Sequence, residues 1–130
     1  MKIQPDLKYA NSDEWVSVEG KIATLGISDF AQSQLSDVVF VEVNAAVGET
    51  VQKNATVATV ESVKAAADII SPVSGKVVAV NEALSTTPEQ VNSDPFGAAW
   101  LLKVEMSNPA ELDNLMDAPA YEKYCASRSH

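Results

Sequence analysis

The sequence has few of the residues that enzymes use for nucleophilic or metal-dependent chemistry. Its 130 residues include one cysteine, Cys125, and one histidine, His130. A serine or cysteine nucleophile generally needs a basic partner such as histidine, and a structural zinc site takes four ligands, mostly nitrogen and sulfur. A single cysteine cannot form an intramolecular disulfide, which fits a reducing compartment. These absences argue against autonomous catalysis.

Long apolar runs and the common nucleotide-binding motifs are also absent. No stretch approaches the ~20 apolar residues of a membrane-spanning helix. Residues 1–6 have neither the apolar run of a signal peptide nor the arginine-rich character of a transit peptide. Neither G-x-x-x-x-G-K-[ST] nor G-x-G-x-x-G occurs. We therefore expect a cytoplasmic protein.

Positive charge is scarce. Nine Lys and Arg residues stand against 18 Asp and Glu residues, which gives a formal net charge of -9. A negative field repels nucleic-acid phosphates and anionic lipid, so we expect neither nucleic acid nor a membrane as a partner. The same field favours partners with basic docking surfaces, although surplus acid also serves solubility.

Short alternating segments bounded by turn residues dominate the first hundred positions. The expected strands are 15–19, 22–25, 38–43, 55–61, 66–70, 76–80 and 100–105. This pattern predicts a mainly β fold, a flattened barrel or sandwich, in a single domain over residues 1–130. We assign Gly20, Gly26, Gly48 and Gly75 to the turns between strands, where positive φ is most often needed.

Three helices are predicted around this β framework. A short inner helix follows Ser28, a plausible N-cap. A second should begin at Asn108–Pro109, with Glu111 completing a capping-box-like start. A third should run from Asp117 to about Ser127. The aromatic residues Trp15, Phe30, Phe40 and Trp100 fall on apolar periodicities and are expected in the core.

The most informative segment surrounds a lysine between two strand-like runs. These runs flank residues 62–65 and place Lys64 at or near the tip of a hairpin, with its amine in solvent. A modifying enzyme needs such an accessible lysine. On its own, however, an exposed lysine is an ordinary surface residue.

This segment resembles the biotinyl and lipoyl attachment domains. Lys64 lies in a short turn and is followed by Pro72-Val73-Ser74-Gly75-Lys76-Val77, which matches their Pro-x-x-Gly-x-Val element. Biotin acceptors usually have Met-Lys-Met, and the lipoyl domains of acyltransferases have Asp-Lys-Ala. Glu61-Ser62-Val63-Lys64-Ala65 is instead similar to the glycine cleavage H-protein family.

The resemblance to this family extends over about Leu7 to Tyr124. Matching blocks occur in the family's order, among them Glu14–Val16, Gly26–Gln32, Leu35–Glu42, Val80–Leu84, Asn92–Gly97 and Trp100–Lys103. It implies a lipoyl-domain fold of the hammerhead type with a short inner helix and C-terminal helices.

The resemblance further implies a non-catalytic carrier with lipoate attached to Lys64. Glycine decarboxylase would load an aminomethyl group, a tetrahydrofolate-dependent aminomethyltransferase would remove it, and dihydrolipoyl dehydrogenase would reoxidise the arm. A lipoate ligase or a lipoyl/octanoyl transferase would attach it. The alternatives are a biotin acceptor, another lipoyl carrier such as a lipoate relay, and an unmodified interaction protein.

Several carboxylates acquire candidate roles by the same resemblance. Glu61 is a candidate recognition residue for the modifying enzyme. Glu14 and Asp68, with Ser12 as a neutral partner, are candidates to hold the cationic end of the loaded arm. The competing interpretation is that these are solvated surface residues.

Two positions depart from the family pattern near these residues. Asp13 replaces the usual histidine and turns a titratable cation site into an anion. Ala99 replaces a common glycine, which is expected to remove a positive-φ turn.

Overall fold

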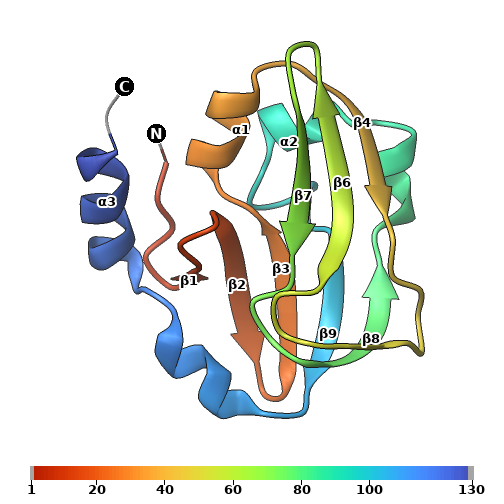
Figure 1. The fold of residues 1–130 in the computed structure, drawn as a ribbon, viewed down its shortest axis with the longest axis vertical. Helices are drawn as coiled ribbons and strands as arrows, with labels where there is room; N and C mark the ends of the chain where they lie inside the picture. Colours follow the sequence, from red (N-terminus) through yellow and green to blue (C-terminus); the bar gives the residue numbers. More distant parts are fainter. Residues whose placement is uncertain (1, 129–130) are drawn as a thin grey trace.

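The computed structural model describes residues 2–128, so the histidine His130 lies outside the described residues. Most strands belong to a six-stranded antiparallel sheet, and three strands form a second antiparallel sheet (Figure 1). In the order of pairing, the six strands are β1 (Lys8–Tyr9), β2 (Glu14–Glu19), β3 (Ile22–Ile27), β9 (Leu102–Met106), β8 (Gly75–Val80) and β5 (Thr50–Val51). The three strands are β4 (Val38–Val43), β6 (Thr56–Ser62) and β7 (Ala66–Ile70).

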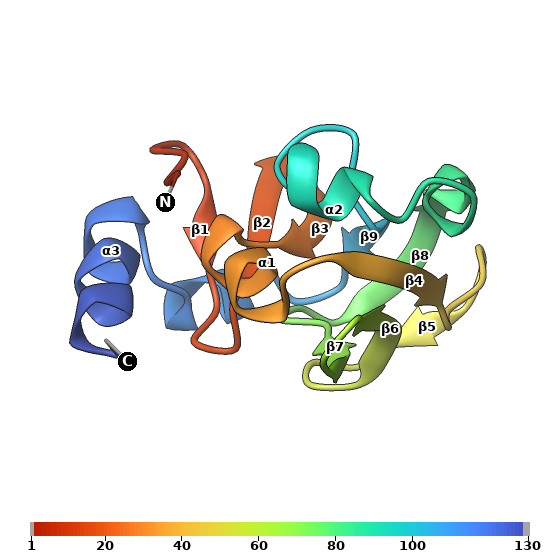
Figure 2. The same ribbon diagram turned by 90° about the horizontal axis from the view of Figure 1, so that it is seen from above.

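The two sheets form two layers, as the view from above shows (Figure 2). They enclose one large apolar cluster, to which β2, β3 and β9 contribute Val16, Leu25 and Val104, and the smaller sheet contributes Val41 and Val60. Each side chain of this size stabilises the fold by about 1.5–3 kcal/mol when fully buried. The predicted mainly β sandwich is confirmed.

The helices are α1 (Asp29–Leu35), α2 (Gln90–Ser93), α3 (Ala118–Ser127) and the 3₁₀ turns η1 (Glu82–Ser85) and η2 (Pro109–Asn114). Two helices, α1 and α2, lie together at one end of the sandwich, whereas α3 lies at its side next to β1 (Figures 1 and 2). The predicted inner helix is confirmed, because the Ser28 hydroxyl caps α1 by accepting a hydrogen bond from the N–H of Ala31. The predicted last helix is confirmed too, with Asp117 as its N-cap.

The predicted helix does begin at Pro109, but it is a short 3₁₀ helix and its predicted capping box is wrong. η2 is a 3₁₀ turn, and the side chain of Asn108 makes no capping hydrogen bond. Glu111, which would have completed the capping box, instead accepts hydrogen bonds from the N–H and the hydroxyl of Ser74. Glu111 is therefore bound to a residue 37 positions away in the chain, and its side chain does not cap the start of the helix.

Two of the four glycines assigned to turns are within strands. Gly20 and Gly48 do have positive φ, at 63° and 96°. Gly26, however, lies inside β3, where a Cβ would come within 2.5 Å of the indole ring of Trp15. Gly75 begins β8, where a Cβ would lie 2.0 Å from the carbonyl oxygen of Glu105. At these two positions glycine serves close packing.

Candidate functional site

The hairpin of β6 and β7 projects from one end of the three-stranded sheet (Figure 1). The Ser62 hydroxyl organises its tip, because it accepts hydrogen bonds from the N–H groups of Lys64 at 3.3 Å and Ala65 at 3.1 Å. The N–H of Ser62 also donates to the carbonyl of Ala65 at 2.7 Å, and Val63 N–H donates to Asp37 O at 3.0 Å. Serine thus supplies the turn chemistry that a Val-Lys pair lacks.

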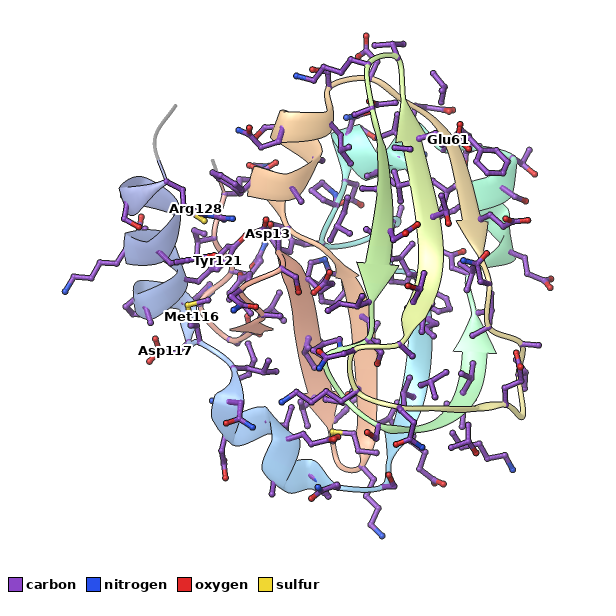
Figure 3. The ribbon with its side chains drawn as sticks, viewed as in Figure 1. Asp13, Glu61, Met116, Asp117, Tyr121 and Arg128 are labelled. Atoms are coloured by element: carbon purple, nitrogen blue, oxygen red, sulfur yellow. The ribbon has the colours of Figure 1, made fainter. Side chains whose placement is uncertain are left out.

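Lys64 is exposed at this tip, as the sequence predicted. Within residues 2–128, no carboxylate lies within ion-pair distance of its amine. The neighbouring Val63 is 67% exposed. Glu61 is also exposed, on β6, where it is paired with Phe40 of β4 and Ala66 of β7 (Figure 3). The tip therefore offers an accessible lysine beside apolar and acidic surface.

Ser12 and Glu14 form a second group of candidate residues, at the start of β2. The Ser12 hydroxyl donates a short hydrogen bond to Oε1 of Glu14. Glu14 is only 2% exposed, although a carboxylate is rarely buried without a cation. The described residues provide no ion pair to it. A buried carboxylate that lacks a cation partner is costly to ionise.

The environment of Glu14 favours its neutral form. Burial raises the pKa of the Glu14 carboxyl group to about 7, because an ionised group loses solvation there, and the charge of Asp13 adds to the increase. Hydrogen bonds from Ser12 and from the backbone of Ile70 act in the opposite direction. A pKa of about 7 leaves both the neutral and the ionised form of Glu14 accessible near neutral pH, and a cation close to the carboxyl group would favour the ionised form.

β7 connects the two groups of candidate residues. The backbone of its last residue, Ile70, lies close enough to the Glu14 carboxyl group to lower the pKa of that group. Asp68 lies two residues earlier on the same strand, opposite Thr59 of β6, and its side chain is exposed. Asp68 follows Lys64 by four residues, about 13 Å along an extended strand. The structure thus joins Ser12 directly to Glu14, with Asp68 between this pair and the hairpin tip.

No local sequence pattern predicts the contacts that surround Asp13. This residue has φ of 77°, and its carboxylate accepts hydrogen bonds from Arg128 and from the hydroxyl of Tyr121 (Figure 3). Arg128 lies 115 residues away in the chain, so no local spacing could have indicated the pair. The other departure from the family, Ala99, is buried and does not have positive φ.

One of the four aromatic residues expected in the core is on the surface. Trp15 is buried, and Phe30 and Trp100 pack half-buried against the aromatic cluster around Tyr9 and Tyr121. Phe40, however, is 42% exposed and lines a surface groove of about 720 Å³. The register of β4 shifts between Val38 and Phe40, and this bulge turns Phe40 outward.

No cluster of three or more His, Cys, Asp or Glu side chains among residues 2–128 has the arrangement of a metal site. None of the helices in that range has the length and apolar character needed to span a membrane.

Comparison with known proteins gives a consistent result. The family model of the glycine cleavage H-protein matches residues 7–128. The H protein of Thermotoga maritima is 53% identical over 119 residues, which cover 92% of this chain and 95% of that protein. The H protein of Koribacter versatilis is 52% identical, with 99% of this chain and 98% of that protein covered. A crystal structure of the H protein from Mycobacterium marinum has a TM-score of 0.83 at 34% identity, covering 96% of this chain and 98% of that one. The chain belongs to the glycine cleavage H-protein family.

Proposed function

We propose that this chain is the lipoyl carrier of a glycine cleavage system, with lipoate in amide linkage to Lys64. The observation that carries the proposal is the exposed lysine on a hairpin tip that Ser62 closes, in a chain of the H-protein family. We take residues 1–130 as one lipoyl-carrier domain, since both sheets contribute to one apolar cluster.

The residues around the hairpin suit lipoate. The Lys64 amine is solvent-accessible, as amide formation requires. When bound, lipoate supplies a cyclic disulfide whose sulfur accepts and releases a carbon fragment. The protein contributes attachment and protection, and this chain acts as a shared substrate rather than as a catalyst.

Glu14 is the proposed contact for the aminomethyl group in the loaded state. The amine of that group is cationic near neutral pH, so it favours an ionised carboxylate and forms a charge-assisted hydrogen bond with it. Ser12 already holds the Glu14 carboxylate through its hydroxyl. Asp68 is exposed on β7 and provides a second negative charge between the hairpin tip and Glu14.

The partners in this proposal are those of the carrier cycle. Glycine decarboxylase loads the arm, a tetrahydrofolate-dependent aminomethyltransferase unloads it, and dihydrolipoyl dehydrogenase reoxidises it. A lipoate ligase or a lipoyl/octanoyl transferase modifies Lys64. Glu61 is exposed three residues before Lys64, which makes it available to the modifying enzyme as a recognition residue.

The test is the intact mass of the chain expressed with lipoate available, followed by peptide mapping. We expect one lipoyl increment on Lys64, its loss in Lys64→Ala, and its retention in Lys76→Ala, which removes an exposed lysine from β8. An unmodified chain from a host that lipoylates a control domain would contradict the proposal. Glycine cleavage with the three partner enzymes then separates this role from a lipoate relay.

A further inference from the structure

The turn that carries Ser12 is attached to the C-terminal helix. This turn, residues 10–13, connects β1 to β2 and ends directly before Glu14. α3 reaches it at two points: the hydroxyl of Tyr124 donates to the carbonyl of Asn11 at 3.2 Å, and Tyr121 and Arg128 both donate to Asp13. Figure 3 shows the side chains of Tyr121 and Arg128 directed from α3 toward Asp13.

The ion pair of Arg128 and Asp13 is bidentate and partly buried, unlike an ordinary surface ion pair. The guanidinium nitrogens Nη1 and Nη2 donate to Oδ2 and Oδ1 of Asp13, at 3.2 and 2.6 Å respectively. The guanidinium also lies 4.2 Å from the ring centres of Phe30 and Tyr124. The side chains of Arg128 and Asp13 are only 28% and 17% exposed. Bidentate geometry and aromatic packing restrict the pair to one arrangement.

Tyr121 adds a directed hydrogen-bond chain. Its hydroxyl lies 2.6 Å from Ser28 Oγ and donates to Asp13 Oδ1 at 2.8 Å, so Ser28 is the donor in the first contact. Burial raises the pKa of Tyr121, and its hydroxyl keeps the proton that it donates. Stacking on Tyr9, with ring centres 4.4 Å apart, fixes the phenol ring.

The backbone of Asp13 has an unusual conformation, which the contacts of its side chain help to hold. Its φ of 77° is a conformation that most L residues avoid, although Asp and Asn tolerate it. Its N–H donates to Ala10 O at 3.0 Å, and its carbonyl accepts from Ser28 N–H at 2.8 Å. Asp13 is thus held through both backbone and side chain, and the direction of the chain into Glu14 follows from it.

We propose that Asp13 is a positioning residue, which ties the 10–13 turn to α3 and thereby holds Ser12 and Glu14 in the arrangement that receives the loaded arm. The arm's contact rests on the carrier function proposed above, whereas the positioning of Glu14 does not. A carboxylate can accept two hydrogen bonds from a guanidinium, which a neutral imidazole or an amide oxygen cannot do in the same bidentate geometry. The attachment of the turn therefore depends on the acidic side chain at position 13.

The first test is a pH titration of Glu14 in the unmodified chain. Carbon-13 NMR of the glutamate carboxyl groups measures its pKa. Arg128→Met removes the main partner of Asp13, and Lys123→Met removes an exposed charge from the same helix as the matched control. Loss of a nearby positive charge alone would raise the pKa of Glu14. Release of the turn would instead admit water and weaken the Ser12 hydrogen bond. Because burial is the larger of these two influences, the net effect would be to lower this pKa from about 7 toward 4.5.

We expect the pKa of Glu14 to fall by about one unit or more in Arg128→Met and to stay unchanged in Lys123→Met. A pKa that rises or stays constant in folded Arg128→Met overturns the proposal. Tyr121→Phe removes one hydrogen bond to Asp13 without a change of charge, and it decides the question if Arg128→Met does not fold. A lowered pKa of Glu14 in this variant supports the proposal, and an unchanged one overturns it.

The second test uses the lipoylated, aminomethyl-loaded chain. We expect Arg128→Met to shorten the hydrolytic lifetime of the loaded form about five-fold or more, and the double variant with Glu14→Ala to be no worse than Glu14→Ala alone. Additive losses would show that Arg128 does not act through Glu14. Failure to load the wild-type chain would refute the carrier function, while the titration of Glu14 would still test the positioning role.

Discussion

Glu111 and Ser74 are joined by two hydrogen bonds, from the N–H of Ser74 to Oε1 at 2.6 Å and from its hydroxyl to Oε2 at 2.8 Å. The contact attaches η2 to the turn before β8, and Ser74 is itself buried. Hydrogen bonds to a charged group contribute about 1.5–3 kcal/mol, and an unpaired buried donor adds a cost.

We therefore expect Glu111→Ala to lower the free energy of unfolding by about 2 kcal/mol, measured by urea denaturation. Asp113→Ala, which removes an exposed carboxylate from the same 3₁₀ turn, should change it by less than about 0.5 kcal/mol. If the two variants have equal free energies of unfolding, the contact of Glu111 with Ser74 does not stabilise the fold.

A second prediction concerns the close approach of β8 and β9. In Gly75→Ala the new methyl group would meet the backbone carbonyl of Glu105 at 2.0 Å, and a backbone atom within a sheet cannot move aside without disturbing the pairing. We expect a loss of roughly 3 kcal/mol or failure to fold. Gly97→Ala is the comparison, because there the obstacle is the side chain of Asp94. Thermal unfolding measures the stability of both variants. A smaller loss of stability in Gly75→Ala than in Gly97→Ala would contradict the predicted close packing of β8 on β9.

The pKa of Glu14 predicts a dependence of stability on pH. The folded chain binds the Glu14 proton up to about pH 7, whereas the unfolded chain releases it near 4.5. The contribution of Glu14 is therefore fully present below pH 4.5 and is lost as the pH rises through 7. Its size is on the order of 3 kcal/mol over this range.

Denaturation curves at several pH values would measure this dependence. In Glu14→Gln the amide does not titrate, so the decline between pH 4.5 and 7 should become shallower than in the wild type. Parallel pH profiles of the two chains would show that folding does not raise the pKa of Glu14.

A fourth prediction concerns the loaded carrier. If Glu14 holds the aminomethyl ammonium, Glu14→Ala should speed hydrolytic loss of that group about ten-fold, as expected for removal of one charge-assisted hydrogen bond. The decay of the loaded mass over time measures it. Glu19→Ala, at the exposed end of the same strand, is the control. Unchanged lifetime in Glu14→Ala would exclude this role.

Much of this architecture could be predicted from local sequence because the determining interactions are local. The strands follow alternation, and the caps at Ser28 and Asp117 act over three residues. The exposed lysine was inferred from the runs on either side of residues 62–65. β1 and β5, with two residues each, are too short to show a periodicity.

The remaining features depend on tertiary structure. The bulge in β4 that exposes Phe40 cannot be recognised from the sequence, because the surrounding run is rich in valine and shows no break. The family resemblance indicated Glu14, but its burial and raised pKa arise from the packing of β2 near Ile70. Asp13 was noticed as a departure, and its partner at position 128 became visible only in three dimensions.

The hairpin tip keeps its shape without help from the lysine side chain. Ser62 accepts hydrogen bonds from two backbone N–H groups, one of which belongs to Lys64 itself. The Lys64 side chain is thus energetically decoupled from its own loop. A modification of the Lys64 amine would therefore change the size and charge of this side chain without altering the backbone hydrogen bonds that shape the tip.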